Sequence, residues 1–341
     1  MDPNSLNLIK GAAGAGGGSV DLAVAHATTP FISVYPWDAG FGTKYSDPST
    51  LPTGHGDTVV FSPDGADLVV THATSPYISV YPWSSGFGTK YSDPGTAIPS
   101  TSRGCAFSPD GADLAVVYSI ISPYIYVYPW SSGFGTKYAD PSTLPANHAE
   151  GVAFSPDGAD LAVAHYDSPY VSVYPWSSGF GTKYSDPSTL PASHSIAIAF
   201  SPDGADLAVA HQTSPYISVY PWSSGFGTKY ADPSTLPTGN GRNVAFSPDG
   251  ADIAVAHYNS PGISVYPWSG SGFGTKYSDP STVFAGADDV AFSPDGSLIA
   301  VVSGSSPYIY VYPWSSGFGT KYSDPSPTPY AALGVAFSPA A

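Results

Sequence analysis

Short apolar stretches alternate with turn residues along almost the whole chain. Between residues 151 and 184, Gly151–Ser155 and Asp160–His165 are apolar runs, Tyr170–Tyr174 alternates between apolar and polar positions, and Phe180–Tyr184 forms a fourth run. Pro-Asp-Gly, Ser-Pro and Ser-Ser-Gly sequences separate these runs. Short apolar or alternating runs bounded by Gly, Pro, Asp and Ser predict short β-strands.

This four-strand unit is repeated around seven tryptophans, each within the sequence Tyr-Pro-Trp and followed by Gly-Phe-Gly-Thr-Lys-Tyr. They are spaced 46 or 47 residues apart, at Trp37, Trp83, Trp130, Trp176, Trp222, Trp268 and Trp314. Repeats of about 40–50 residues with four short strands are typical of β-propeller blades. The sequence therefore predicts an all-β, seven-bladed propeller with four-stranded blades.

The two ends of the repeat array are complementary. The first repeat lacks a first strand and begins with Asp21–His26, whereas the chain ends with Gly334–Pro339, a first strand with nothing after it. Pairing of the C-terminal strand with the N-terminal blade would close the ring and remove exposed sheet edges. We therefore expect a closed propeller over residues 19–341.

The repeated sequence Phe-Ser-Pro-Asp-Gly followed by Leu-Ala-Val-Ala resembles WD40-like and YVTN-type propeller repeats over residues 19–339. The resemblance implies the fold. Only Trp37 is followed by Asp, and Gly-His occurs once, at Gly54-His55. The resemblance therefore does not extend to the hydrogen-bonded tetrad of the standard WD40 blade.

Residues 1–18 differ from the repeats. An Asp-Pro pair that can start a helix precedes apolar side chains at Leu6, Leu8 and Ile9, and residues 11–18 form a Gly/Ala tether. We interpret this segment as an anchor that docks on another protein; the alternative is a frayed terminus without a role. The first residues and the Gly/Ala run are similar to the start of some tailed-phage virion proteins.

Composition and charge restrict the partners. Gly and Pro make up 73 of 341 residues, which excludes a mostly helical fold. The net charge of −16 argues against nucleic acid and anionic membranes as partners. The single cysteine, Cys105, excludes intrachain disulfides and fills a repeat position that is Val152 in another blade, so we assign it to the core. The N-terminus lacks the pattern of a signal peptide.

Most residues with chemical potential recur too regularly to form one site. Five histidines occupy one repeat position, at the end of the second strand, and we expect each to bond to a nearby loop: His26, His72, His165, His211 and His257. Asp157, Asp160 and their equivalents are expected to cap turns and face solvent, with a calcium site as the alternative. The Gly-Phe-Gly-Thr-Lys sequence lacks the spacing of a phosphate loop. We expect no catalytic residues, metal or cofactor.

The loops on the face opposite the Ser-Pro-Asp-Gly turns differ from blade to blade. Such loops are where an asymmetric partner would be recognised, although relaxed drift of exposed loops is the alternative. The candidate partner-binding residues are His55, Arg103, His148, His194, Arg242, Asp288 and Asp289.

These observations favour a non-enzymatic structural or interaction propeller. We expect a phage virion component, bound to a shell or tail protein through its N-terminal segment, with a host glycan or protein on the variable-loop face; otherwise a soluble protein. A glycan-binding propeller is the alternative. A lactonase-like hydrolase is the weaker alternative, because first strands reading Val-Ala-Phe offer little polarity to a central channel.

Overall fold

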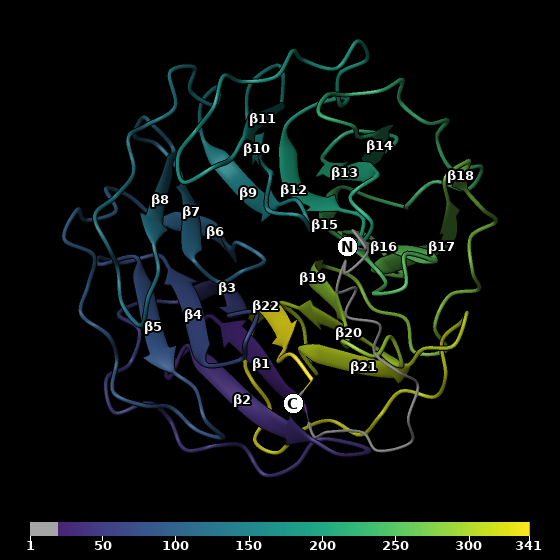
Figure 1. Cartoon of the computed structure of the whole chain (residues 1–341). Coiled ribbons are helices and arrows are strands. Elements are labelled where there is room, and N and C mark those ends of the chain that lie inside the picture. The colour runs from purple at the N-terminus through teal and green to yellow at the C-terminus, as the bar shows by residue number, and fades with distance from the viewer. Residues whose placement is uncertain (1–19, 341) are drawn as a thin grey trace, which may run out of the picture.

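Seven small antiparallel sheets stand around a central axis in the computed structural model, which describes residues 20–340 (Figure 1). Each sheet is a blade with an inner, a middle and an outer strand. The inner strands are β22 (Ala332–Phe337), β3 (Gly56–Phe61), β6 (Ser102–Phe107), β9 (Ala149–Phe154), β12 (Ser195–Phe200), β15 (Gly241–Phe246) and β19 (Ala287–Phe292). We number these blades 1 to 7 in that order.

The middle and outer strands follow the predicted runs. The middle strands are β1 (Val20–His26), β4 (Asp67–His72), β7 (Asp113–Tyr118), β10 (Asp160–His165), β13 (Asp206–His211), β16 (Asp252–His257) and β20 (Leu298–Ser303). The outer strands are β2 (Ile32–Trp37), β5 (Ile78–Pro82), β8 (Ile125–Pro129), β11 (Val171–Pro175), β14 (Ile217–Pro221), β17 (Ile263–Ser269) and β21 (Ile309–Pro313).

The fourth strand is much shorter than the sequence suggested. Only blade 6 has one, β18 (Gly272–Phe273); in the other blades it is reduced to a single bridge such as Trp83↔Phe87. The chain beyond the bridge still donates backbone hydrogen bonds to the outer strand, for example from Tyr91 N–H to the Val80 oxygen at 2.9 Å. Glycines on both sides of the phenylalanine weaken a regular ladder there.

The ring is closed as predicted. β22 pairs with β1 in an antiparallel register that runs from Leu22↔Phe337 to Ala25↔Gly334. The candidate anchor residues Leu6, Leu8 and Ile9 lie outside the described residues. Between residues 20 and 340, the structure contains no helix long and apolar enough to cross a membrane.

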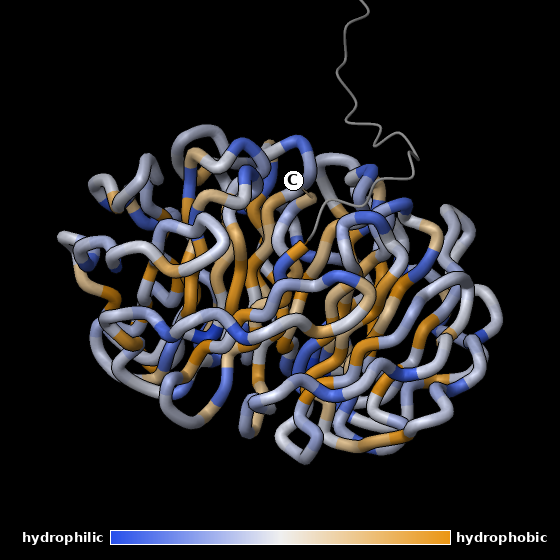
Figure 2. The backbone as a smooth tube through the Cα atoms, turned by 90° about the horizontal axis from the view of Figure 1, so that it is seen from below, coloured by the Kyte–Doolittle hydropathy of each residue, from blue (hydrophilic) through white to orange (hydrophobic). Residues whose placement is uncertain are grey.

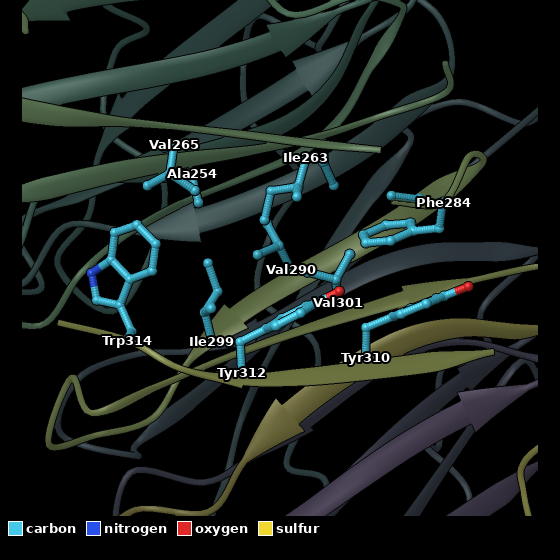
Figure 3. Close-up of a cluster of buried hydrophobic side chains, with 12 residues drawn as sticks. Ala254, Ile263, Val265, Phe284, Val290, Ile299, Val301, Tyr310, Tyr312 and Trp314 are labelled. Carbon is cyan, nitrogen blue, oxygen red and sulfur yellow. The ribbon is translucent and has the colours of Figure 1, made fainter. Parts of the chain in front are cut away.

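Successive blades pack through apolar side chains. Between blades 6 and 7, Ile263 and Val265 of β17 lie near Val290, Ile299 and Val301 (Figure 3). Seen from the side, hydrophobic residues follow the strands, whereas hydrophilic residues gather in the loops at the two faces (Figure 2).

A buried aspartate at the start of the middle strand links neighbouring blades. Asp206 accepts hydrogen bonds from Trp268 Nε1 of the next blade and from the Tyr230 hydroxyl, both at 2.9 Å. Six blades have this aspartate bonded to the next tryptophan, and the seventh has Leu298 at the same position. The expectation of a solvated acidic face was therefore wrong for this set. Asp157 and its equivalents do cap their turns, as predicted.

Candidate functional site

The second residue of every inner strand lines one mouth of the central channel. Next to this residue the pairing with the middle strand shifts by a β-bulge, as between Ser102 and Gly104 in blade 3. A bulged residue is released from the ladder, so its side chain can point into the channel. These residues lie at one end of a cavity of about 540 Å³ that continues along the inner strands to Phe61, Phe292 and Phe337. We call the seven of them the mouth ring: Leu333, Asp57, Arg103, Glu150, Ile196, Arg242 and Asp288.

The mouth ring holds the rarest charged residues of the chain. Both arginines and the only glutamate lie in it. The inner strands below it are nearly constant in sequence, with Val-Ala-Phe or close variants. The expectation of an apolar channel was therefore wrong, because it was drawn from the constant part of these strands and not from the bulged residue.

The charges form two groups separated by apolar side chains. In ring order, Asp57, Arg103 and Glu150 are followed by Ile196, then by Arg242 and Asp288, and then by Leu333. Arg103 Nε lies 3.7 Å from Glu150 Oε2. On the other side of Asp57, His55 Nε2 lies 3.5 Å from Asp57 Oδ1.

Burial makes the mouth-ring carboxyls weaker acids than usual. It raises the pKa of Asp57, which His55 and Arg103 partly counteract, and it raises the pKa of Asp288 to about 6 against the charge of Arg242. Burial also raises the pKa of Glu150, although Arg103 and Arg242 both act to lower it. Glu150 is the mouth-ring carboxyl that senses both arginines.

Two polar atoms of the ring lack an internal partner. Within residues 20–340, neither Asp57 Oδ2 nor Arg242 Nε forms a hydrogen bond, although both atoms are buried. Buried polar atoms without partners are costly, and a bound ligand or water that pairs with them removes this cost. The mouth ring therefore presents both an acceptor and a cationic donor to whatever enters it.

Known structures share this architecture. No protein-family model and no curated protein sequence matches the chain. The periplasmic gluconolactonase PpgL of Pseudomonas aeruginosa aligns at 18% identity over 95% of this chain and 100% of its own, with a TM-score of 0.74. A putative 6-phosphogluconolactonase of Bacteroides uniformis aligns at 15% identity over 94% and 99%, with a TM-score of 0.70. A Lactobacillus plantarum protein aligns at 17% identity over 94% and 99%, with a TM-score of 0.75.

The chain has the fold of these lactonase-type propellers. The expectation of a non-enzymatic virion component is wrong, because three of the similar structures are named as a gluconolactonase or as putative 6-phosphogluconolactonases. The sequence argument gave too much weight to a short N-terminal resemblance and overlooked the polar channel mouth.

The structure brings the predicted partner-binding residues together around this mouth. Arg103, Arg242 and Asp288 belong to the ring itself. His55, His148 and His194 each occupy the residue before an inner strand, two positions from a ring residue. Their role in binding stays a prediction.

Asp289 has a different environment from the other candidates. Its side chain is buried and accepts hydrogen bonds from Val290 N–H and from Val335 N–H of β22, at 2.8 and 2.9 Å. Burial raises its pKa to about 7, against these two hydrogen bonds. Asp289 therefore ties the closing strand to blade 7.

Sequence reasoning missed Asp57 and Glu150. The signal was present, because rare charged types fall at one repeat position, but these residues looked like the ends of variable loops. The prediction for the repeated histidines is confirmed in four of the five: His72 Nδ1–H, for example, donates to the Thr74 oxygen at 2.8 Å, and its Nε2 lies 3.1 Å from Ser79 Oγ. It is wrong for His26, whose Nδ1 has no hydrogen-bond partner within residues 20–340. Among residues 20–340, His, Cys, Asp and Glu side chains form no group of three or more that could hold a metal ion.

Proposed function

We propose that the protein hydrolyses a polyhydroxylated lactone bound in the mouth ring. The observation that carries the proposal is Glu150, a carboxylate with a raised pKa beside Arg103 and within the field of Arg242. A base and a cationic group facing one cavity are what ester hydrolysis requires. The names of two propellers with the same fold support the same chemistry.

In the proposed reaction, Glu150 takes a proton from a water molecule whose oxygen attacks the lactone carbonyl carbon. The carbonyl oxygen becomes an oxyanion, and the Arg242 guanidinium, with its unpaired Nε–H, stabilises that charge. Collapse of the tetrahedral species breaks the bond to the ring oxygen. That oxygen receives the proton from Glu150, so one lactone and one water give one hydroxy acid.

The remaining charges of the ring suit a substrate with several hydroxyl groups. Asp57 Oδ2, which has no partner within residues 20–340, can accept a hydrogen bond from a sugar hydroxyl. Asp288 offers a second acceptor two blades away, beyond Leu333 of blade 1. Arg103 is a positioning residue, because it holds the Glu150 carboxylate from the neighbouring blade.

The test is hydrolysis of D-glucono-1,5-lactone followed in a pH-stat. Glu150→Gln should lower kcat by about 10²–10⁴-fold, the usual contribution of a general base. Arg242→Gln should lower it by about 10²–10³-fold. The matched control is Asp38→Asn, an exposed carboxylate outside the channel, which should leave kcat unchanged.

The pH profile provides a second readout. Because burial raises the pKa of Glu150, kcat/KM of the wild type should increase with pH through the weakly acidic range, and Glu150→Gln should lose this increase. A Glu150→Gln variant that retains wild-type kcat and its pH profile would contradict the assignment.

A further inference from the structure

An asymmetric pair of exposed tyrosines stands on the rim beside the mouth ring. The residue that follows each middle strand is small or polar in five blades and tyrosine in two, in the order Ala27, Ala73, Ser119, Tyr166, Gln212, Tyr258 and Gly304. Tyr166 is 48% exposed and Tyr258 is 55% exposed. Large aromatic side chains left in solvent on one sector of a face are typical of a binding surface.

The two tyrosines flank blade 5, where the charged ring is interrupted by Ile196. Tyr166 N–H donates to the His148 oxygen at 2.9 Å, and Tyr258 N–H donates to the Asn240 oxygen at 3.1 Å. These acceptors lie two residues before Glu150 and Arg242. The backbone therefore fixes each tyrosine next to a residue of the proposed reaction.

Aromatic rings continue from Tyr166 across blades 4 and 5. The Tyr166 ring lies 4.2 Å from that of His194 and 5.9 Å from that of His148, centroid to centroid. On the far side of blade 5, the Arg242 guanidinium lies 5.6 Å from the Tyr258 ring centroid. The rim thus offers aromatic faces on both sides of the uncharged gap at Ile196.

Blade 5 contributes polar groups without a fixed charge to the middle of this sector, whereas charged groups stand at its edges: Asp167 directly follows Tyr166, and the Arg242 guanidinium lies beside Tyr258. Gln212 follows the middle strand of blade 5, and its backbone N–H donates to the His194 oxygen at 3.2 Å. Burial lowers the pKa of His194, which favours the neutral imidazole. Within residues 20–340, its buried Nε2 has no hydrogen-bond partner. A neutral ligand with both apolar faces and hydroxyl groups satisfies these features.

We infer that the lactone substrate carries a second, uncharged sugar unit, which binds over Tyr166 and Tyr258 outside the mouth ring. This inference rests on the proposed lactone hydrolysis. A pyranose presents C–H groups to an aromatic face and hydroxyls to amide or imidazole groups, so it matches this sector. The preferred substrate class is the lactone of a disaccharide aldonic acid.

The test compares lactobiono-1,5-lactone, which carries the second sugar, with D-glucono-1,5-lactone, which does not. For the wild type, kcat/KM should be about tenfold higher for the disaccharide lactone, the effect of a good aromatic contact. Tyr166→Ala should reduce that preference and leave hydrolysis of gluconolactone unchanged. Tyr258→Ala should also reduce the preference, and because its ring lies against the Arg242 guanidinium it is not used as a test of basal hydrolysis. Tyr166→Phe retains the ring and should retain the preference.

Tyr330→Ala is the matched control. Tyr330 is 57% exposed and lies 4.8 Å from the Tyr308 ring, in the sector of blades 7 and 1. Its removal should not change the ratio of the two kcat/KM values. Equal effects of Tyr166→Ala on both lactones, or no wild-type preference for the larger one, would overturn the inference.

Binding of the products separates this inference from the proposed reaction. Isothermal titration calorimetry with lactobionate and gluconate should show tighter binding of lactobionate to the wild type, and Tyr166→Ala should abolish the difference. If the wild type hydrolyses neither lactone, the proposed function fails. The relative affinities of lactobionate and gluconate then decide whether the second sugar binds at this sector. Equal binding of the two acids would then reject the subsite as well.

Discussion

Acid should unfold this propeller, because it contains five buried neutral histidines. Burial lowers the pKa of each from 6.5 to about 4, in His26, His72, His165, His211 and His257. The unfolded chain therefore binds more protons than the folded one, and stability falls as pH falls from about 6.5 towards 4. At pH 5 each histidine costs about 2 kcal/mol, or about 10 kcal/mol for five.

The buried carboxyls with a raised pKa act in the opposite sense: Asp57, Glu150, Asp288 and Asp289. The pKa of Asp288 is raised to about 6 and that of Asp289 to about 7, so stability increases as pH falls through these values. Between pH 7 and pH 5, Asp288 and Asp289 together offset about 4 kcal/mol of the stability that the histidines remove. The net loss is at most about 5–6 kcal/mol, because Asp57 and Glu150 add to the offset, and this is a large share of the roughly 5–15 kcal/mol that stabilises a typical protein.

The assay is urea unfolding followed by tryptophan fluorescence between pH 7 and pH 5. His211→Ser places in blade 5 the residue that blade 7 has at the same position, Ser303, and should reduce the acid-induced loss by about 2 kcal/mol. Ser315→Ala, which changes an exposed side chain that does not titrate, is the control and should leave the loss unchanged. A loss below about 2 kcal/mol, or an unaltered loss in His211→Ser, would refute the reasoning.

Two further predictions concern the buried aspartates. Asp206→Leu leaves Trp268 Nε1–H and the Tyr230 hydroxyl without their acceptor and should lower the free energy of unfolding by about 2–3 kcal/mol in chemical denaturation. Leu298→Asp gives blade 7 the residue of the other six blades and should change that free energy by less than about 1 kcal/mol. Similar losses in both variants would argue against the link between blades. Asp289→Asn removes a carboxyl whose raised pKa stabilises the wild type by about 1.4 kcal/mol per pH unit as pH falls from 7 towards 4. The variant lacks this contribution, so its free energy of unfolding should fall more steeply with acid than that of the wild type. Identical pH dependence of the urea midpoint in the variant and the wild type would show that Asp289 does not titrate as inferred.

The repeat pattern by itself determined the inner, middle and outer strands, the number of blades and the closure of the ring, but not the length of the fourth strand. Each strand is a short apolar run between turn residues, so neighbours in sequence suffice to define it. The buried histidines were also predictable, because one residue at the end of a strand bonds to the loop that directly follows, as His72 does with Thr74. Complementary ends gave the pairing of β1 with β22.

Only the tertiary structure decided which polar residues face one another. Asp206 and Trp268 are 62 residues apart, and their hydrogen bond exists because one blade packs on the next. The mouth ring is a stronger case. From the sequence, Arg103, Glu150 and Arg242 were assigned to the ends of loops, whereas in the structure a bulge in each inner strand lets their side chains line the central cavity. Closing the ring brings together residues of different blades, which burial and mutual charge then convert from solvated side chains into a site.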